Sequence, residues 1–403
     1  MEFLKANLWE IKKSSTVRIF GILLSLGHVL TFVHWFLQDK LPIKYASSST
    51  PMCWPIMETC DVFRSVPLSL LKVGFGGYLL FAIIAAVLLI SSRLVGIGWF
   101  FFLLATLLKA TLYLQDYRLS ANIHYLHFLL SIVWLFIPCK TLSFKLLIVS
   151  YFLTSATQKL SPEWLTGRWF LQYMEMPVKL AEWFAALSTI IEFIAPIALF
   201  FKDGRYFITS FLTLISYLFM LIYIDNFFAP TLLLLFIFVF PLAILEERRI
   251  EREFIYQSFI RPEPSTLWAY FLGSLFVIGQ VLPLVPNLPV PLHNAGIVLA
   301  LTPGAKVNEC RQNTFLIYNH ETKEVGDEFK SHLAEDARCN PYLRFLEVRS
   351  LCDEKKTDNN FVTVASFFYS RGLKDTSFKE IFGANDICTQ SLKYRDLGVG
   401  HGI

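Results

Sequence analysis

The chain has 403 residues, of which 55% are hydrophobic and 17% are charged, whereas an average soluble protein carries about 25% charged residues. A soluble globule cannot bury that much apolar surface, so the composition excludes an ordinary soluble protein. The net charge is only +4 and the basic residues are dispersed, which leaves no basis for nucleic-acid binding.

The apolar residues fall into blocks, most of which have about twenty residues, the length that crosses a ~30 Å hydrocarbon core as a helix. The first block is too long for a cleaved signal peptide and predicts a retained span. Trp and Tyr at many block ends are typical of the membrane interface. We therefore expect an all-α bundle of about nine transmembrane helices, embedded in membrane lipids, at residues 17–37, 68–90, 94–114, 124–138, 143–158, 180–201, 206–224, 227–245 and 267–284.

The orientation follows from charge and cysteine placement. With the N-terminus in the cytoplasm, the cytoplasmic segments hold more basic residues than the opposite loops, as the positive-inside rule requires. Six of the seven cysteines then face the oxidising side, where disulfides form. This predicts a bacterial inner membrane protein, or one of the endoplasmic reticulum membrane, with a periplasmic or lumenal C-terminus. The six cysteines are Cys53, Cys60, Cys310, Cys339, Cys352 and Cys388.

The composition becomes polar and charged after Pro303. Alternating runs at residues 315–318 and 361–369 predict strands. We expect a transmembrane domain at residues 1–290 and a small extracytoplasmic α+β domain at residues 303–403. Its four cysteines allow three pairings, and we predict at least one disulfide, with free buried thiols as the alternative.

Residues 151–170 combine an apolar span, Lys159 at its outer end and a polar turn with Trp164, Gly167 and Arg168. Burial disfavours the charged form of an amine, so a partly desolvated lysine here can serve as a general base. A lysine at this position can equally extend to the membrane interface or complement the C-terminal helix dipole. Residue types alone leave both interpretations open.

Lys159-Leu160-Ser161-Pro162-Glu163-Trp164-Leu165-Thr166-Gly167 resembles the signature of the vitamin K-dependent gamma-carboxylases and of their bacterial relatives, the horizontally transferred transmembrane (HTTM) domain proteins. The resemblance covers roughly residues 15–290 in layout. It implies that Lys159 deprotonates vitamin K hydroquinone or another quinol. The oxygenated quinone then removes a glutamate γ-proton, and carbon dioxide adds to the carbanion. It further implies an amphipathic quinone-like ligand beside Trp164 and Arg168, and a protein or peptide substrate on the outer side.

Two histidines precede this motif. Residues 122–130 are similar to a family stretch that begins Asn-His, but Ile123 follows Asn122 here and the histidine is displaced to His124. That displacement is a rotation of about 100° around a helix. His127 lies one turn further on and shares the face of His124. Either histidine is a candidate to assist Lys159; the alternative is a pair of interfacial histidines.

Glu192 falls about halfway through the sixth apolar block. A charge at that depth is expensive and is functional by default, and the resemblance places an acidic residue here that orients the site. The competing interpretation is a structural ion pair with Lys72 or Lys109. No metal site is expected, since no C-x-x-C pair occurs.

These observations predict an HTTM-type membrane protein with gamma-carboxylase-like chemistry at Lys159. The alternatives are a non-catalytic ligand-binding or transport-like bundle, and a membrane anchor that presents the C-terminal domain to a partner. The enzyme interpretation requires Lys159 and a histidine in one pocket, whereas the binding interpretation requires only the pocket. The anchor interpretation predicts a tightly filled bundle.

Overall fold

The computed structural model describes most of the helical part of the chain and part of its C-terminal region. The described residues are 2–38, 40–46, 66–116, 119, 122–137, 139–160, 162–167, 170–171, 174–201, 204–224, 227–247, 271, 274, 309–319, 322–324, 341–355, 360–371, 377 and 379–389.

Six described helices are long and apolar enough to cross a membrane, counting α13 and α14 as one. The chain is thus a polytopic helical membrane protein, as its apolar blocks predict. These helices are α2 (Ser15–Leu37), α5 (Leu68–Ile90), α6 (Val95–Leu114), α11 (Val178–Ala198), α12 (Gly204–Ile224), and the consecutive α13 (Phe228–Ile237) and α14 (Val239–Glu247).

Five further helices accompany them. Two of these coincide with the fourth and fifth apolar blocks: the shorter apolar α7 (Asn122–Phe136) and α8 (Lys140–Gln158). The others are short: α1 (Glu2–Lys13), α3 (Leu41–Ala46) and α9 (Pro162–Leu165). The predicted ninth span, residues 267–284, lies outside the described residues apart from positions 271 and 274, so the count of nine stays a prediction.

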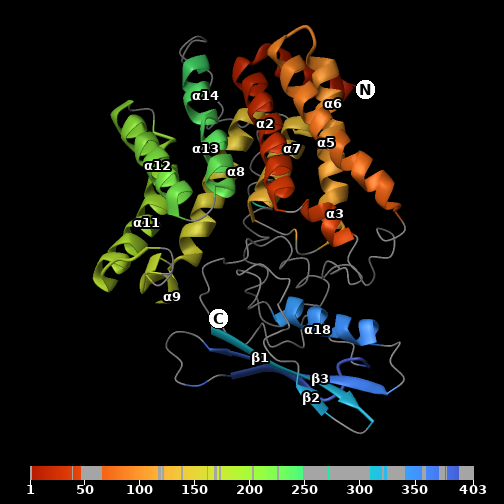
Figure 1. The fold of residues 1–403 in the computed structure, drawn as a ribbon. Helices are drawn as coiled ribbons and strands as arrows, with labels where there is room; N and C mark the ends of the chain where they lie inside the picture. The colour runs from red at the N-terminus through yellow and green to blue at the C-terminus, as the bar shows by residue number, and fades with distance from the viewer. Residues whose placement is uncertain are drawn as a thin grey trace.

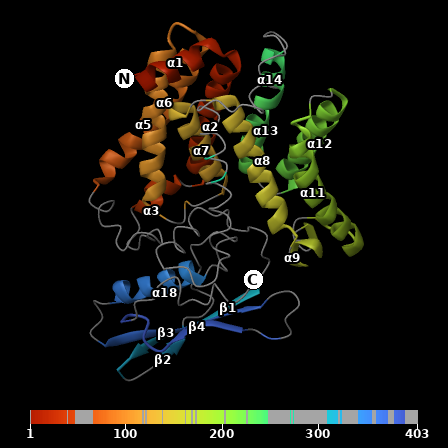
Figure 2. The same cartoon turned by 180° about the vertical axis from the view of Figure 1, so that it is seen from behind.

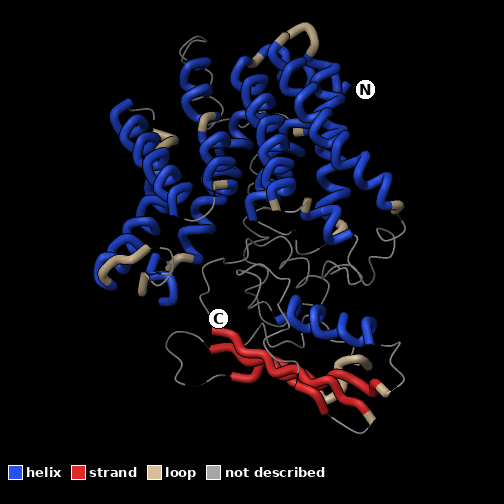
Figure 3. The backbone as a smooth tube through the Cα atoms, viewed as in Figure 1, coloured by secondary structure: helices blue, strands red, loops and turns tan. Residues whose placement is uncertain are grey.

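The long helices run side by side, and the C-terminal strands lie beyond one end of the bundle (Figures 1 and 3). That end, where α2 terminates and α3 and α9 lie, is called the α3 end. Helix α1 lies at the opposite end, called the α1 end, as the view from behind also shows (Figure 2). Helices α11 and α12 form a hairpin at one side, next to α8 and α13.

Helix α2 lies at the centre of the bundle and packs against α5, α6, α7, α13 and α14. Small residues let its neighbours approach closely, as is common in membrane bundles. At Gly21, an added Cβ would lie 2.6 Å from the Trp134 ring of α7, and Trp134 Nε1 donates to Val17 O at 2.9 Å. The hydroxyl of Ser25 donates to the carbonyl of Gly21 one turn earlier, so this buried hydroxyl is satisfied within its own helix.

Polar contacts join the start of α2 to the end of α14 at the α1 end. Ser14 is the N-cap of α2, and Glu246 at the end of α14 accepts from the Ser14 hydroxyl at 2.8 Å and from Thr16 N at 2.9 Å. A carboxylate suits a helix N-terminus, where amide groups lack intrahelical partners. These contacts join two segments more than 200 residues apart in the chain and bring the last described span against the first.

The C-terminal region contains a four-stranded antiparallel sheet in the order β2-β1-β3-β4. Its strands are β1 (Glu309–Tyr318), β2 (Thr322–Glu324), β3 (Phe361–Arg371) and β4 (Lys379–Ala384), and helix α18 (Pro341–Lys355) packs against it. Leu316, Val364 and Phe368 from the sheet contact Phe345 and Val348 of α18 in one apolar core. Both predicted strands are confirmed, whereas the extracytoplasmic placement and the domain limits stay predictions.

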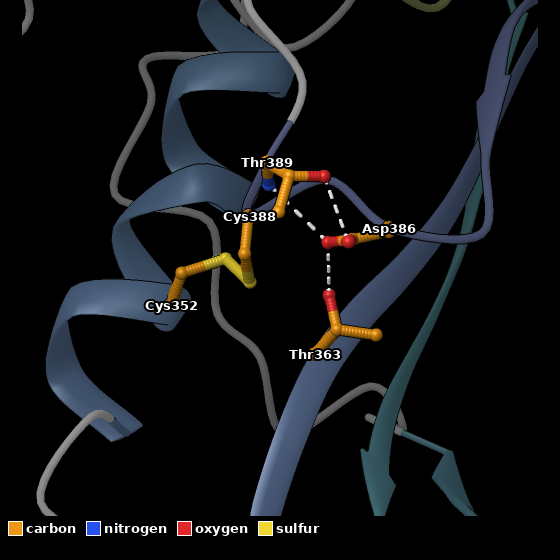
Figure 4. The surroundings of a disulfide bond; sticks show 5 residues. All are labelled: Cys352, Thr363, Asp386, Cys388 and Thr389. Carbon is orange, nitrogen blue, oxygen red and sulfur yellow. Dashed lines mark hydrogen bonds between the residues drawn. A yellow bond between two sulfur atoms is a disulfide. The ribbon is translucent and has the colours of Figure 1, made fainter.

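The predicted disulfide in this region is confirmed. Cys352 of α18 and Cys388, just beyond β4, are joined with an S–S distance of 2.07 Å and a Cα–Cα distance of 5.6 Å (Figure 4). The bond closes a sequence separation of 36 residues, a length for which a disulfide restricts the unfolded chain substantially. Cys310 is also disulfide-bonded. Cys53, Cys60 and Cys339 lie outside the described residues.

Asp386 anchors the segment that carries Cys388. Its carboxylate accepts from the hydroxyl of Thr363 in β3 and from Thr389 Oγ1 at 2.7 Å (Figure 4). These hydrogen bonds, first the one from Thr363, hold the pKa of Asp386 below its usual value. A depressed pKa stabilises the folded state above the unfolded pKa of about 3.9, and the contribution is lost as the pH falls through the folded pKa.

Replacing Asp386 with asparagine is therefore expected to destabilise this segment at neutral pH by less than about 1 kcal/mol, because the carboxylate is largely exposed. Below about pH 4 the difference from wild type should shrink as the wild-type carboxyl group gains a proton. Hydrogen-exchange mass spectrometry on residues 379–389 of the full chain measures it. If the difference in stability between wild type and Asp386→Asn stays constant across the pH range, the Asp386 carboxylate is not the stabilising group.

Candidate functional site

Lys159 is held at the α3 end by the turn that follows α8. It is the C-cap residue of α8, and its amide donates to Ser155 O at 3.1 Å. The short helix α9 then places Trp164 against α11, where Trp164 Nε1 donates to Ala185 O at 3.1 Å. Gly167 ends the turn with a φ of +69°, a left-handed conformation that glycine adopts without strain. The turn thereby presses against α11, the helix that carries Glu192.

Lys159, Glu192 and Tyr217 converge from three segments. Lys159 Nζ lies 2.7 Å from Glu192 Oε1 and 3.0 Å from the Tyr217 hydroxyl. Tyr217 of α12 donates to Glu192 Oε1 at 2.6 Å, and Ser155 of α8 donates to Glu192 Oε2 at 2.9 Å. Both carboxylate oxygens are thus occupied by donors. Trp164 completes the group, with Lys159 Nζ 4.5 Å from its ring centroid. This set is called the Lys159 cluster.

The cluster is buried but electrically balanced. The side chain of Glu192 is 5% exposed and that of Lys159 is 12% exposed. One positive and one negative charge at this depth are tolerable because they contact each other and because further hydrogen bonds satisfy the carboxylate. The face of Trp164 adds a cation–π contact to the ammonium. The arrangement can exchange a proton between an amine and a carboxylate that are already in hydrogen-bond contact.

A cavity of about 480 Å³ adjoins the cluster between α11 and α12. Tyr217 belongs to the cavity and to the Lys159 cluster, because it lines the cavity and forms hydrogen bonds with Lys159 and Glu192. Apolar side chains make up much of the cavity wall, and hydroxyl groups lie between them. An apolar cavity with a few convergent polar groups is the usual form of a small-molecule site. Its wall includes Phe184, Leu187, Ser188, Thr213, Ser216 and Tyr217.

The predicted site residues separate into two groups. Lys159, Glu192 and Trp164 come together as expected, and Arg168 lies outside the described residues. The ion pair of Glu192 is made with Lys159, whereas Lys109, weighed as its partner from the sequence, contacts His127 instead. The enzyme interpretation requires a histidine next to Lys159, and the described contacts of Lys159 include none.

His124 and His127 lie in a different part of the bundle. Lys109 Nζ of α6 is 2.6 Å from His127 Nδ1, and the His127 ring is 4.4 Å, between centroids, from that of His28 in α2. His28, Lys109 and His127 are called the histidine–lysine cluster. His124 is buried among aromatic rings, with Trp35 at 5.2 Å and Phe228 at 5.0 Å between centroids. Both histidines are buried within the bundle.

Sequence reasoning missed Tyr217, Ser155 and His28. Tyr217 and Ser155 sit in apolar helices where a hydroxyl is ordinarily satisfied by its own helix or found at an interface. Ser155 lies one helical turn before Lys159, which is the only available signal that the two share a face. His28 lies in the middle of the first apolar block, and an imidazole at that depth could have been singled out by the reasoning applied to Glu192.

Comparison with known proteins finds no matching family model, no matching curated protein and no matching solved structure. The function of this chain is therefore inferred from its own geometry.

Proposed function

We propose that this membrane protein is of the HTTM, gamma-carboxylase-like type and that it binds an amphipathic quinol-like ligand beside the Lys159 cluster, with Lys159 as the base. The supporting observation is that the Tyr217 hydroxyl joins the Lys159–Glu192 pair to the cavity wall. The residues fit such a ligand, since apolar walls accommodate a ring system while hydroxyl groups of the wall are available to its polar head.

The ion pair determines how Lys159 can act as a base. A protonated lysine accepts no proton, so Lys159 must first release one, and Glu192 Oε1 lies 2.7 Å away to receive it. A bound quinol supplies an acidic hydroxyl group. The neutral amine of Lys159 then takes the hydroxyl proton and becomes an ammonium again, which faces the oxygen it has ionised. The net proton acceptor is Glu192, which ends in its neutral form, and Tyr217 orients both partners.

A non-catalytic ligand-binding bundle is the second candidate. The observation that favours it is the full engagement of the Lys159 ammonium by Glu192, Tyr217 and the Trp164 ring. Such engagement is what a purely structural ion pair shows. The two candidates share the cavity and differ only in whether Lys159 moves a proton.

Menadiol, a water-compatible naphthohydroquinone, tests the proposal under anaerobic conditions with the full chain in lipid nanodiscs. Binding to wild type should lower the ionisation midpoint of menadiol by about one unit or more, since one unit corresponds to about 1.4 kcal/mol. Lys159→Met should retain binding and lose this shift, because it removes the ammonium that faces the ionised oxygen. Ultraviolet absorption of the bound menadiol reports its ionisation.

Lys179→Ala is the matched control, since Lys179 is an exposed lysine on the helix that carries Glu192. It should behave as wild type. A normal shift in the Lys159→Met variant would remove the base role and leave the ligand-binding bundle. Failure of wild type to bind menadiol would refute the quinol proposal as a whole.

A further inference from the structure

The hydrogen bonds of His127 determine which of its ring nitrogens carries a proton. Nε2 lies 3.1 Å from Leu24 O, and a carbonyl oxygen only accepts, so Nε2 is the donor. The neutral ring then presents Nδ1 as an acceptor, and Lys109 Nζ approaches it to 2.6 Å. Gly27 permits the His127 ring to lie close to α2, because a Cβ there would lie 3.0 Å from His127 Nε2. A proton of Lys109 therefore lies between two nitrogen bases.

His28 is surrounded by oxygens whose own protons are used elsewhere. Tyr78 donates its hydroxyl proton to His28 O at 2.9 Å, and Thr106 donates its proton to Phe102 O at 2.9 Å. The same two oxygens face the ring of His28, Tyr78 at 3.1 Å from Nδ1 and Thr106 at 3.4 Å from Nε2. Each hydroxyl has only one proton to give. When both hydroxyl protons are used in this way, each ring nitrogen of His28 faces a lone pair, so the ring can carry a proton on each nitrogen.

The histidine–lysine cluster carries basic groups without an acid. Within the part of the chain that the structure describes, Lys109 has no carboxylate at ion-pair distance, and its polar contact is to His127. The groups that face the cluster are Tyr78 from α5, His124 from α7, and apolar side chains such as Leu232 and Phe236 from α13. Two positive charges this close in an apolar interior repel strongly. The cluster is therefore suited to hold one proton. That proton lies either between Lys109 and His127 or on His28.

Two further histidines, His124 and His34, lie between the cluster and the α3 end. His124 lies three residues before His127 on α7, which places the two on one helix face. Its Nδ1 is buried and has no hydrogen-bond partner among the described residues, so it is open to a proton donor or acceptor. The His124 ring is 6.4 Å, between centroids, from that of His34. His34 is partly exposed and lies in the last turn of α2.

We propose that the histidine–lysine cluster is an intramembrane proton-binding site that exchanges its proton with the α3 end of the bundle through His124 and His34. Each imidazole accepts a proton at one nitrogen and releases one from the other, so each ring returns to its starting charge after every transfer. The assignment uses different residues from the Lys159 cluster and does not depend on the quinol proposal.

Nuclear magnetic resonance of the full chain in nanodiscs, with isotope-labelled imidazole nitrogens, tests the proposal. Substitution of single histidines assigns the signals among the eight present. In wild type, the protonation of the His127 or His28 nitrogens should change as the bulk pH is lowered. In His34→Phe, the exchange of ring protons at His127 with water should slow by about a hundredfold, the lower end of what a positioned proton-transfer group contributes.

His34→Phe preserves packing, because His34 stacks on Phe228 at 4.1 Å with planes 10° apart. Ser131→Ala is the matched control: it removes a buried hydroxyl that donates to His127 O at 2.8 Å and leaves the ring nitrogens untouched, so exchange should equal wild type. Lys109→Met should move the His127 titration to higher pH, since a neighbouring positive charge disappears. Unchanged exchange in His34→Phe, or cluster nitrogens that ignore the bulk pH, would overturn the proposal.

Discussion

Glu192→Leu should destabilise the helical bundle by about 3–5 kcal/mol, the typical cost of removing one partner from a buried ion pair. The variant leaves the Lys159 ammonium without its counter-ion, and it removes the acceptor of the Ser155 and Tyr217 hydroxyl protons. In hydrocarbon such donors find no water as a substitute. The free energy of unfolding in detergent–denaturant mixtures, followed by circular dichroism, measures the loss.

A double variant separates lost charge balance from lost packing. Lys159→Met combined with Glu192→Leu removes both charges, and it should recover much of the stability lost in the single variant, because neither charge remains to be compensated. Ser155→Ala removes a single hydrogen bond to Glu192 and should cost only about 1 kcal/mol. If Glu192→Leu alone is as stable as the double variant, the ion pair does not hold the bundle together.

The helices were predictable because each span must satisfy its backbone within one apolar stretch. Eight of the nine apolar blocks coincide with described helices, and the strands at residues 315–318 and 361–369 follow from alternation over a buried face. The breaks at Phe238, between α13 and α14, and in the turn around Gly167 were not predictable. They depend on how one helix lies against another rather than on hydrophobicity.

The partners of the intramembrane charges were only partly predictable. Depth and cost single out Glu192, and a terminal position singles out Lys159, but the rotation of α8, α11 and α12 decides that they meet. Lys109 has the same residue type and a similar setting in its helix, yet it faces α2 and α7 and finds an imidazole. Hydrophobic periodicity carries little information on rotation in a span that is apolar on every side.

Lys159 and Lys109 are thus stabilised within the bundle in different ways. The carboxylate of Glu192 balances Lys159 with a full opposite charge, whereas His127 offers Lys109 only a lone pair. An ion pair resists the loss of the lysine proton, and an imidazole acceptor can take that proton itself. For this reason the Lys159 cluster requires a ligand to displace its proton, while the histidine–lysine cluster is suited to reversible exchange.

Gly167→Ala should strongly destabilise the turn that positions Lys159. A Cβ at Gly167 would lie only 2.5 Å from Ala181 O and from Glu182 N, both backbone atoms of α11. Left-handed φ costs a residue with a Cβ about 1–2 kcal/mol, and overpacking adds about 1–3 kcal/mol. Because the neighbours are backbone, the turn and α11 must separate, which displaces Trp164 from Ala185 and weakens the contact of Lys159 with Glu192.

The free energy of unfolding in detergent–denaturant mixtures and the menadiol ionisation shift together measure this effect. Both quantities should be smaller in Gly167→Ala than in wild type. Gly76→Ala is the matched control, since Gly76 lies in α5 and an added Cβ there meets no atom within 4 Å. That change should be neutral or stabilise α5 by up to about 1 kcal/mol, because alanine favours the helical backbone more than glycine does. Wild-type stability together with a normal ionisation shift in Gly167→Ala would show that the close approach to α11 is not what holds Lys159 in place.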